Sequence, residues 1–389
     1  MTEGLVAARA RAVRIPIRIR RVMLHALERP LVGKLGTAFR DIVNHRSLLV
    51  RVEDQDGVAG WGEASSVDLP AYAPDSLESS WYALTRLLAP RVVGVEFEGP
   101  AAAAQAWAGL RGYHYAKHAL EAAIWAVASE RLVLPLSRQW GGVRGEVAVG
   151  ESIGMKETED ELLAEVEKRV AEGYCRIKLK IGPGWDVDPL RAVAARFPGV
   201  PLSADANCHY ESHLDGPWRE IDELGLTMIE QPLAADALCE LADLQATLRT
   251  PICLDESASS PGITSAALRL GAGRIVNVKA ARLGGLLAAM EVHDLCQAGS
   301  IPVWCGGILE SGIGRGFNLA LCSLTNFSLA ADMSPAKIFF DEDLVDPTYD
   351  IRPDGTMAVP AGLGCGFPVQ EDRIRRYTTA TWNSETDRA

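Results

Sequence analysis

Long apolar segments are missing from this sequence. No stretch reaches the roughly 18 consecutive apolar residues that a membrane-spanning helix requires. The arginine-rich N-terminus is not followed by the apolar segment of a secretory signal. The formal net charge is −12 at pH 7, and an acidic protein is repelled by nucleic acid and by anionic membranes. We therefore expect a protein that binds neither nucleic acid nor a membrane.

Paired metal-binding cysteines and histidines are missing as well. The eight cysteines form no C-x-x-C pair, and the seven histidines form no H-x-H or H-E-x-x-H motif. These absences disfavour a structural zinc site, a zinc hydrolase and a disulfide framework. Cysteines scattered through apolar segments are typical of free thiols in a reducing compartment, so we expect a cytoplasmic protein.

Lysine is scarce, and its placement is informative. Only eight of the 389 residues are lysine, whereas Lys and Arg together number 39. Three of the eight lie in or at the ends of short apolar segments: Lys178, Lys180 and Lys279. Acidic residues end similar segments between the last two lysines, at intervals of 24 or 25 residues: Asp205, Glu230 and Asp255. One strand and one helix of a parallel barrel occupy about this length.

Strand-like segments alternate with helical segments from about residue 146 onward. Eight strands are predicted, near 146–152, 175–181, 201–205, 227–230, 251–255, 274–279, 301–305 and 326–330. Helical patterns separate them, at about 158–171, 186–197, 217–224, 236–247, 261–270, 284–298 and 311–323. Such alternation fits a (β/α)8 barrel or an open doubly wound sheet. The barrel is favoured, because a closed barrel brings successive strand ends around one cavity.

The first 130 residues have a different pattern. The predicted elements there are strands at 12–22 and 46–63 and helices at about 76–90, 99–110 and 114–130. Strands followed by helices describe a small α+β domain. The sequence thus predicts an α/β protein with three parts: an α+β capping domain (1–130), a (β/α)8 barrel (131–349), and a C-terminal segment (350–389) that packs back on the capping domain and completes it.

The charged residues at the strand ends can form one catalytic site. Lys180 ends the second barrel strand and Lys279 the sixth, so the two lysines face each other across an eight-strand barrel. The three carboxylates lie between them and suit Mg²⁺, for which Mn²⁺ can substitute. Such a cation stabilises the enediolate that forms when a base removes the proton α to a carboxylate. We therefore expect a small-molecule carboxylate as the substrate.

Lys178 is predicted to support the base. It lies two residues before Lys180, so both side chains point to the same face of the strand. Adjacent ammonium groups disfavour each other's charge, which lowers the pKa of Lys180 toward the value that a general base needs.

Eight motifs carry a resemblance to a known family. They are RIKLKIGPGWD (176–186), DAN (205–207), IEQPL (229–233), PICLDES (251–257), RIVNVKAARLGG (274–285), PVWCGGILESGIGR (302–315), GTAF (36–39) and WGEA (61–64). With these motifs the sequence resembles the enolase superfamily, and within it the muconate-lactonising subgroup. More narrowly, it resembles the family of o-succinylbenzoate synthases and N-succinylamino acid racemases.

The resemblance implies a role for each residue of the set. Lys180 would be the acid/base, Lys178 its support and Lys279 the opposing lysine, and the Mg²⁺ ligands would be Asp205, Glu230 and Asp255. Arg282 matches an arginine that the racemase branch carries three residues beyond the opposing lysine.

Two positions depart from the family pattern. Ala280-Ala281 stands where many relatives have Pro-Gly, and Glu151 stands where a small or apolar residue is usual. Both departures bear on substrate preference rather than on the chemistry.

Five residues are predicted to contact the substrate: Ser152, Asn207, Arg282, Gly307 and Ile308. Ser152 ends the first strand, where it can either bind a carboxylate or cap the next segment. Asn207 can equally be a turn residue. Glu256 is predicted to support the site without binding the metal.

Three functions stay open. The first is elimination of water from 2-succinyl-6-hydroxy-2,4-cyclohexadiene-1-carboxylate, which gives o-succinylbenzoate for menaquinone synthesis. The second is racemisation of an N-succinylamino acid. The third is a non-catalytic metal-binding barrel, which is disfavoured because the lysine pair would have no role. A dipeptide epimerase is disfavoured too, because the eighth strand carries Asp332 alone and not D-x-D. The family resemblance further implies a homo-oligomer.

Two segments of the capping domain are expected to close over the barrel mouth. They are the stretch from about Leu24 to Phe39 and the turn from about Asp56 to Glu63. A metal site needs protection from water, and no barrel loop is long enough to serve as a lid.

Overall fold

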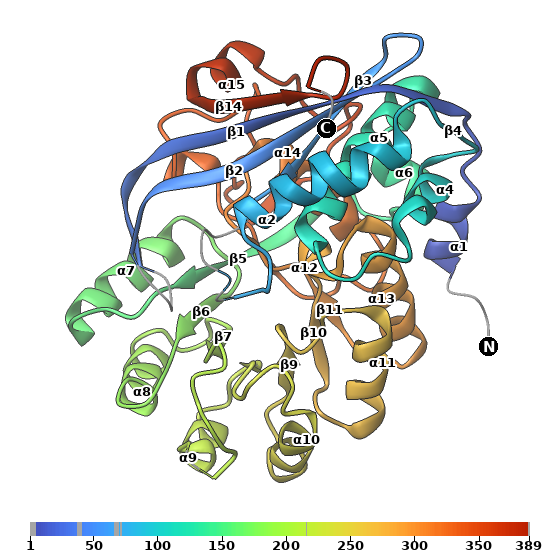
Figure 1. The fold of residues 1–389 in the computed structure, drawn as a ribbon. Helices are drawn as coiled ribbons and strands as arrows, with labels where there is room; N and C mark the ends of the chain where they lie inside the picture. The colour runs from blue at the N-terminus through green and yellow to red at the C-terminus, as the bar shows by residue number, and fades with distance from the viewer. Residues whose placement is uncertain (1–4, 37–40, 66–69, 71, 215, 388–389) are drawn as a thin grey trace.

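Eight parallel strands form the second part of the chain (Figure 1). The computed structural model describes residues 5–36, 41–65, 70, 72–214 and 216–387. The barrel strands are β5 (Glu146–Ile153), β6 (Ile177–Lys180), β7 (Leu202–Asp205), β8 (Ile229–Glu230), β9 (Ile252–Leu254), β10 (Ile275–Asn277), β11 (Val303–Trp304) and β12 (Ala331–Asp332). They are hydrogen-bonded in the order β11-β10-β9-β8-β7-β6-β5-β12.

The barrel closes between β11 and β12. Phe327 forms a parallel bridge with Val303, and Asp332 N donates to Cys305 O at 3.0 Å. The predicted (β/α)8 barrel is therefore confirmed. Seven predicted strands overlap observed ones, but the prediction of the eighth at 326–330 was wrong: β12 begins at Ala331. Only Phe327 of the earlier stretch is bridged to a strand, so that stretch runs beside β11 without forming a ladder.

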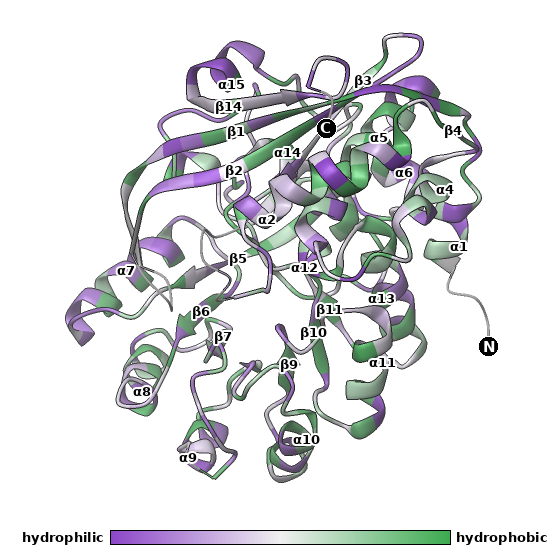
Figure 2. Cartoon of the chain, in the orientation of Figure 1, coloured by the Kyte–Doolittle hydropathy of each residue, from purple (hydrophilic) through white to green (hydrophobic). Residues whose placement is uncertain are grey.

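Helices surround the barrel and cover it. They are α7 (Glu159–Ala171), α8 (Val187–Arg196), α9 (Trp218–Glu223), α10 (Leu238–Thr247), α11 (Pro261–Leu270), α12 (Ala280–Leu283), α13 (Leu286–Ala298) and α14 (Gly312–Cys322), followed by the short 3-10 helix η3 (Ala336–Ile338). Outer helices such as α7 carry both hydrophilic and hydrophobic residues (Figure 2), as expected for helices with one side on a core. Within the described part of the chain, every helix is too short or too polar to cross a membrane.

The inside of the barrel has its own small core. Met228, Cys253, Ile275 and Trp304 form a buried cluster, separate from the larger core that contains Leu179 and the helices' apolar residues. Side chains alternate along a strand, so the residues next to Leu179 point to the other face. Lys178 accordingly lies 4.9 Å from the centre of the Trp304 ring, inside the barrel.

The first domain is built on an antiparallel sheet in the order β14-β1-β2-β3. Its strands are β1 (Ile17–Gly36), β2 (Asp41–Asp54), β3 (Ala59–Ala64), β4 (Glu96–Phe97), which pairs with β1, and β14 (Thr378–Asn383). Its helices are α1 (Leu5–Arg11), α2 (Leu77–Tyr82), the π-helical η1 (Ala83–Leu88), α3 (Ala89–Val92), α4 (Pro100–Ala104), the 3-10 helix η2 (Gln105–Trp107), α5 (His114–Leu132) and α6 (Leu136–Trp140). Helix α1 was not predicted.

The C-terminal segment joins both parts. It contains β13 (Thr356–Ala358), α15 (Glu371–Tyr377) and β14. Strand β13 pairs with β5 of the barrel, whereas β14 pairs with β1 and so completes the antiparallel sheet, as expected. The predicted residue limits of the domains stay a prediction.

The WGEA motif packs the capping sheet onto α5 and onto the barrel. A Cβ atom at Gly62 would lie 2.0 Å from Ala119 O, so only glycine allows β3 to approach α5 this closely. Glu63, the next residue, accepts hydrogen bonds from Ser311 N at 3.1 Å and Gly314 N at 3.0 Å, at the start of α14. A carboxylate at a helix N-terminus satisfies free N–H groups and complements the helix dipole.

One of the two expected lid segments, the turn at Asp56, was placed wrongly, whereas closure by the other stays a prediction. Residues Leu24 to Gly36 continue β1 and pair with β2, and 37–40 lie outside the described residues. The turn at Asp56 contacts Arg131 at the end of α5, and Figure 1 shows the β2–β3 turn directed away from the barrel. Asp54 Oδ1 accepts from the N–H groups of residues 56 and 58, which closes this turn locally. The capping domain contacts the barrel through Glu63, Ser65 and Tyr72.

Candidate active site

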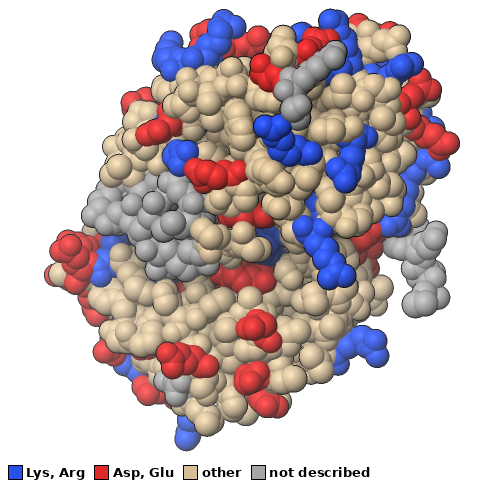
Figure 3. Space-filling view, in the orientation of Figure 1, with Lys and Arg blue, Asp and Glu red and all other residues tan. Residues whose placement is uncertain are grey.

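The charged residues predicted from their spacing gather at the carboxyl ends of the strands. Lys180, Asp205 and Glu230 end β6, β7 and β8 and are adjacent in the strand register. Asp255 directly follows β9, and Lys279 follows β10 by two residues. Figure 3 shows acidic and basic side chains together in a hollow near the centre of this face.

Lys178 is a buried cation surrounded by carboxylates. Its Nζ lies 2.7 Å from Glu230 Oε2, 3.0 Å from Asp205 Oδ2 and 2.7 Å from Asp332 Oδ2. Burial by itself lowers the pKa of Lys178, but these three carboxylates outweigh burial and raise the pKa above its ordinary value. Lys178 is therefore charged at neutral pH, and its supporting role stays a prediction.

Lys180 is the most accessible of the three lysines. Its side chain is 24% exposed, against 4% for Lys178 and 9% for Lys279. Its Nζ lies 2.7 Å from Asp205 Oδ2 and also donates to Asn207 Oδ1. Asn207 has a positive φ of 42°, so it is a turn residue that also contacts the predicted base. A substrate entering the barrel mouth can reach Lys180.

Lys279 lies in a separate hydrogen-bonded group on the other side of the mouth. Its Nζ is 2.9 Å from Asp255 Oδ2 and 2.9 Å from the Tyr72 hydroxyl. Arg282 donates to Asp255 Oδ1 and, at 2.9 Å, to the same hydroxyl. Tyr72 in turn donates to Asp255 Oδ1 at 2.8 Å. Burial raises the pKa of Tyr72, so its phenol stays protonated at neutral pH.

The charge state of Asp205 follows from its neighbours. Burial by itself raises the pKa of this carboxyl, but the ammonium groups of Lys178 and Lys180 outweigh burial and hold the pKa well below its usual range. Glu256 differs: burial and the Asp205 charge raise its pKa to about 7. Asn207 Nδ2 donates to Glu256 Oε1 at 3.0 Å, as expected for a supporting residue.

The donor set fits a hard divalent cation by chemistry. Three carboxylates supply only oxygen, the donor type that Mg²⁺ prefers. Glu256 Oε2 is also buried without a hydrogen-bond partner among the described residues. The described residues contain no group of three or more His, Cys, Asp or Glu side chains already arranged around a metal position. Asp205 and Glu230 share Lys178, whereas Asp255 turns to Lys279 and Arg282, so ion pairs occupy these oxygens.

Two family models match this chain: the mandelate racemase / muconate lactonizing enzyme N-terminal domain over residues 19–141, and the enolase C-terminal domain-like model over residues 161–373. The chain belongs to the enolase superfamily.

Relatives within the superfamily match nearly the whole chain. The o-succinylbenzoate synthase of Geobacillus kaustophilus is 42% identical over 93% of this chain and 96% of its own length. The N-succinylamino acid racemase of Thermus thermophilus is 41% identical over 93% of this chain and 98% of its own length. A solved structure of an enolase superfamily member from Listeria innocua superposes with a TM-score of 0.90, at 32% identity over 94% of this chain and 99% of that one. The chain is therefore an enzyme of this superfamily, and the non-catalytic alternative is set aside.

Two residues of the site were not predicted from the sequence of this superfamily member. Tyr72 reaches Lys279 from the capping domain. Asn277 connects two strands, because its Nδ2 donates to Glu230 Oε1 at 2.7 Å and its Oδ1 accepts from Gly306 N at 2.8 Å. A signal for Asn277 was present, since it lies two residues before Lys279 on the same strand face. Tyr72 had no such signal.

Gly306 is expected to be required for the position of Lys279. A Cβ atom there would lie 2.4 Å from Lys279 Cε and 2.6 Å from Asn277 Nδ2. Gly306→Ala should displace the lysine, lower turnover and cost about 1–3 kcal/mol of unfolding free energy. Steady-state kinetics and urea unfolding measure both effects. Gly145→Ala is the control, because nothing lies within 4 Å of that position. If Gly306→Ala turns over substrate at the wild-type rate, Gly306 is not required for the position of Lys279.

The other residues predicted to contact the substrate lie around the same mouth. Ser152 lies beside Lys178 in the register of β5 and β6. Gly307 is exposed, and Ile308 O accepts from Ser65 Oγ of the capping domain at 2.8 Å. Arg282 is tied to Asp255, as described above. Their contacts with substrate stay predictions.

The two departures from the family pattern, Glu151 and Ala280-Ala281, lie behind the site. Glu151 neighbours Ser152 on β5, so its side chain points to the other face of the strand. It is buried there, accepts a hydrogen bond from Ser334 Oγ, and burial raises its pKa to about 7. Ala280 and Ala281 are buried in α12, where Ala281 joins the capping-domain core. These residues pack the structure rather than line the mouth.

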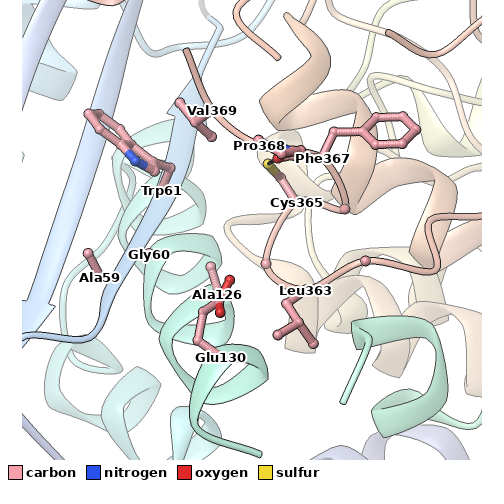
Figure 4. Close-up of a pocket in the computed structure, with 13 residues that line it drawn as sticks. Ala59, Gly60, Trp61, Ala126, Glu130, Leu363, Cys365, Phe367, Pro368 and Val369 are labelled. Atoms are coloured by element: carbon pink, nitrogen blue, oxygen red, sulfur yellow. Dashed lines mark hydrogen bonds between the residues drawn. The ribbon is translucent and has the colours of Figure 1, made fainter. Parts of the chain in front are cut away.

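A pocket of about 400 Å³ lies elsewhere, between β3, α5 and residues 362–369 (Figure 4). Trp61, Glu130, Leu363 and Phe367 are among its lining residues, and none of the predicted site residues lines it. The pocket therefore has no part in the site of this superfamily enzyme.

Proposed function

We propose that this enzyme removes the proton α to a carboxylate, and that its reaction is the elimination of water that forms o-succinylbenzoate. The observation that carries the proposal is the placement of two lysines at opposite ends of one row of carboxylates. Lys180 contacts Asp205 at 2.7 Å, and Lys279 contacts Asp255 at 2.9 Å. The identity of about 40% to named o-succinylbenzoate synthases supports the choice of this reaction.

In this reaction Lys180 acts as base and then as acid on one face of the substrate ring. Lys180 must first release its own ammonium proton, after which it takes the proton from the carbon that bears the carboxylate. The electron pair of that C–H bond moves onto the carboxylate and forms an enediolate, which then collapses as the neighbouring C–OH bond breaks. The Lys180 ammonium then returns its proton to the departing hydroxyl, so water leaves and the ring becomes aromatic.

Positive charge must oppose the electron density that the substrate carboxylate gains. Asp205, Glu230 and Asp255 would hold Mg²⁺, which supplies this charge when bound. Lys279 adds a second cation beside the same intermediate. Burial by itself lowers the pKa of Lys279, but Tyr72 and the Glu230 and Glu256 carboxylates outweigh burial and raise it. Lys279 is therefore charged in the resting enzyme and suited to stabilise an enediolate.

The second candidate reaction is racemisation of an N-succinylamino acid. The position of Lys279 favours it, because a proton donor opposite the base can protonate the other face of the same α-carbon. Lys180 and Lys279 then exchange roles for the two enantiomers. The identity of 41% to the Thermus thermophilus racemase supports this candidate.

Purified enzyme with Mg²⁺ and each substrate tests the proposal directly. Dehydration is followed by the ultraviolet absorbance of the aromatic product, and racemisation by optical rotation. A kcat/KM for dehydration above that for racemisation supports the first reaction, and the reverse order supports the second. Failure of a folded, Mg²⁺-loaded preparation to turn over either substrate would contradict the proposal. A homo-oligomer and a cytoplasmic location stay predictions.

Tyr72→Phe is expected to lower racemisation more than dehydration. The Tyr72 hydroxyl contacts Lys279 and Arg282, and the Lys279 Nζ lies 4.5 Å from the centre of the Tyr72 ring. Without the hydroxyl, Lys279 loses a partner that fixes its position, and the unfolding free energy should fall by about 1–3 kcal/mol. Parallel kinetics with both substrates measure the difference. Tyr82→Phe, at a site that is 51% exposed, is the control. Equal losses in both reactions would speak against this role.

A further inference from the structure

Asp332 lies at the end of β12, opposite the strands that carry the proposed metal ligands, and is not one of those ligands. Its Oδ2 is 2.7 Å from Lys178 Nζ, and its Oδ1 accepts from Arg176. The side chain is 12% exposed, and its backbone is fixed by pairing with Gly150 and by the hydrogen bond to Cys305 O. Asp332 is thus a rigidly placed carboxylate inside the barrel.

Arg176 holds the Asp332 side chain in place through an ion pair. Its Nη1 donates to Ser203 Oγ at 3.1 Å and its Nη2 to Ala330 O at 3.1 Å, and its guanidinium lies 4.5 Å from the centre of the Trp304 ring. A buried arginine with these partners fixes one oxygen of Asp332 and leaves the other for Lys178.

Lys178 has three N–H donors and, among the residues that the structure describes, three carboxylate partners. Two of them, Asp205 and Glu230, are proposed metal ligands, whereas Asp332 is the partner outside that set. A cation bound by Asp205 and Glu230 competes with Lys178 for their oxygens. Only Asp332 can hold the ammonium equally well with and without the metal.

We infer that Asp332 is a positioning residue that anchors Lys178 and so keeps Asp205 and Glu230 free to bind the metal. The inference rests on the proposed function, because it needs the metal site proposed above. Without the Asp332 charge, Lys178 is held by Asp205 and Glu230 alone, and the metal must displace it from both.

Asp332→Asn should therefore weaken metal binding by about 10–100-fold, as loss of an outer partner of a metal site does. Binding of Mn²⁺ is measured by electron paramagnetic resonance and of Mg²⁺ by calorimetry, without substrate. The Mg²⁺ concentration for half-maximal turnover should rise in step, whereas kcat at saturating Mg²⁺ changes little. Asp332→Glu, which keeps the charge, should recover most of the affinity. Asp332→Ser, which leaves room for water beside Arg176, replaces Asp332→Asn if that variant does not fold.

A double-mutant cycle with Lys178→Gln separates anchoring from other effects. If Asp332 acts through Lys178, removing its charge in the Lys178→Gln background should change affinity by about twofold or less, the usual scatter of independent effects. An undiminished loss in that background would overturn the inference and indicate direct attraction to the metal. Arg176→Gln should weaken metal binding less than Asp332→Asn does. If it weakens metal binding as much, the effect of Asp332→Asn is due to altered packing and not to the loss of the anchor.

Asp205→Asn distinguishes this inference from the proposed function. In one outcome, wild type binds Mn²⁺, Asp205→Asn does not bind it, and Asp332→Asn binds it as tightly as wild type does. The anchoring role of Asp332 is then wrong, whereas the proposed metal site is supported. If wild type binds no divalent cation, or Asp205→Asn binds as tightly as wild type, both are wrong.

Discussion

Lys180→Ala is expected to lower dehydration and racemisation alike by about 10²–10⁴-fold or more, the usual contribution of a general base. Both reactions begin or end with proton transfer at Lys180 in the proposed mechanism, and alanine can neither take nor return a proton. The exposure of Lys180, 24% against 4% for Lys178, leaves it as the lysine of this pair that substrate can reach. Lys178 cannot replace it, because three carboxylates hold that ammonium.

Lys279→Ala should have a different effect. It should stop racemisation, which needs a proton donor on the opposite face of the α-carbon. Exchange of the α-proton should survive for the one enantiomer whose proton faces Lys180. Arginine is a poor replacement at either position, because it stays charged and accepts no proton.

Incubation of each variant with both enantiomers of an N-succinylamino acid in D₂O tests the two lysines together. Nuclear magnetic resonance follows loss of the α-proton signal. Lys168→Ala, an exposed lysine of α7, is the matched control and should exchange both enantiomers as wild type does. Exchange of both enantiomers by Lys180→Ala at the wild-type rate would show that the base is assigned wrongly.

The barrel could be predicted because its pattern is local and repeats. Each strand is a short apolar segment that ends in a functional residue, and the intervals of 24 or 25 residues between Lys180 and Lys279 match one strand and one helix. The register that places Lys180, Asp205 and Glu230 side by side follows from strand order alone. The same pattern failed for the eighth strand, because the extended stretch before Ala331 forms only one bridge.

Contacts between distant parts of the chain could not be predicted in this way. Tyr72 meets Lys279 across 207 residues, and Arg176 meets Asp332 across 156. No spacing or periodicity connects such pairs, and each depends on how the capping domain or the last strand closes onto the barrel. The length of β1 also escaped prediction, because residues beyond 22 lack a regular alternation and gain their strand structure by pairing with β2.

The position of Asp332 in the sequence did not indicate its contacts in the structure. Its isolation on the eighth strand predicted only that the D-x-D of a dipeptide epimerase is missing. The structure places it against Lys178 and Arg176, where it balances buried positive charge.

Removal of divalent cations is expected to abolish turnover, and added Mg²⁺ or Mn²⁺ should restore it. The reason is electrostatic: the enediolate of a carboxylate carries two negative charges, and the cationic lysines already neutralise the buried carboxylates around them. The protein is dialysed against a chelator, and its remaining metal content is determined by analysis. Turnover is then assayed before and after addition of Mg²⁺. Circular dichroism of the metal-free protein confirms that the fold persists. Added Mg²⁺ should not restore turnover in Asp255→Asn. It should restore turnover in the control Asp188→Asn, which lies on the exposed surface of α8. Full activity in a preparation shown by analysis to contain no divalent metal would contradict the proposed chemistry.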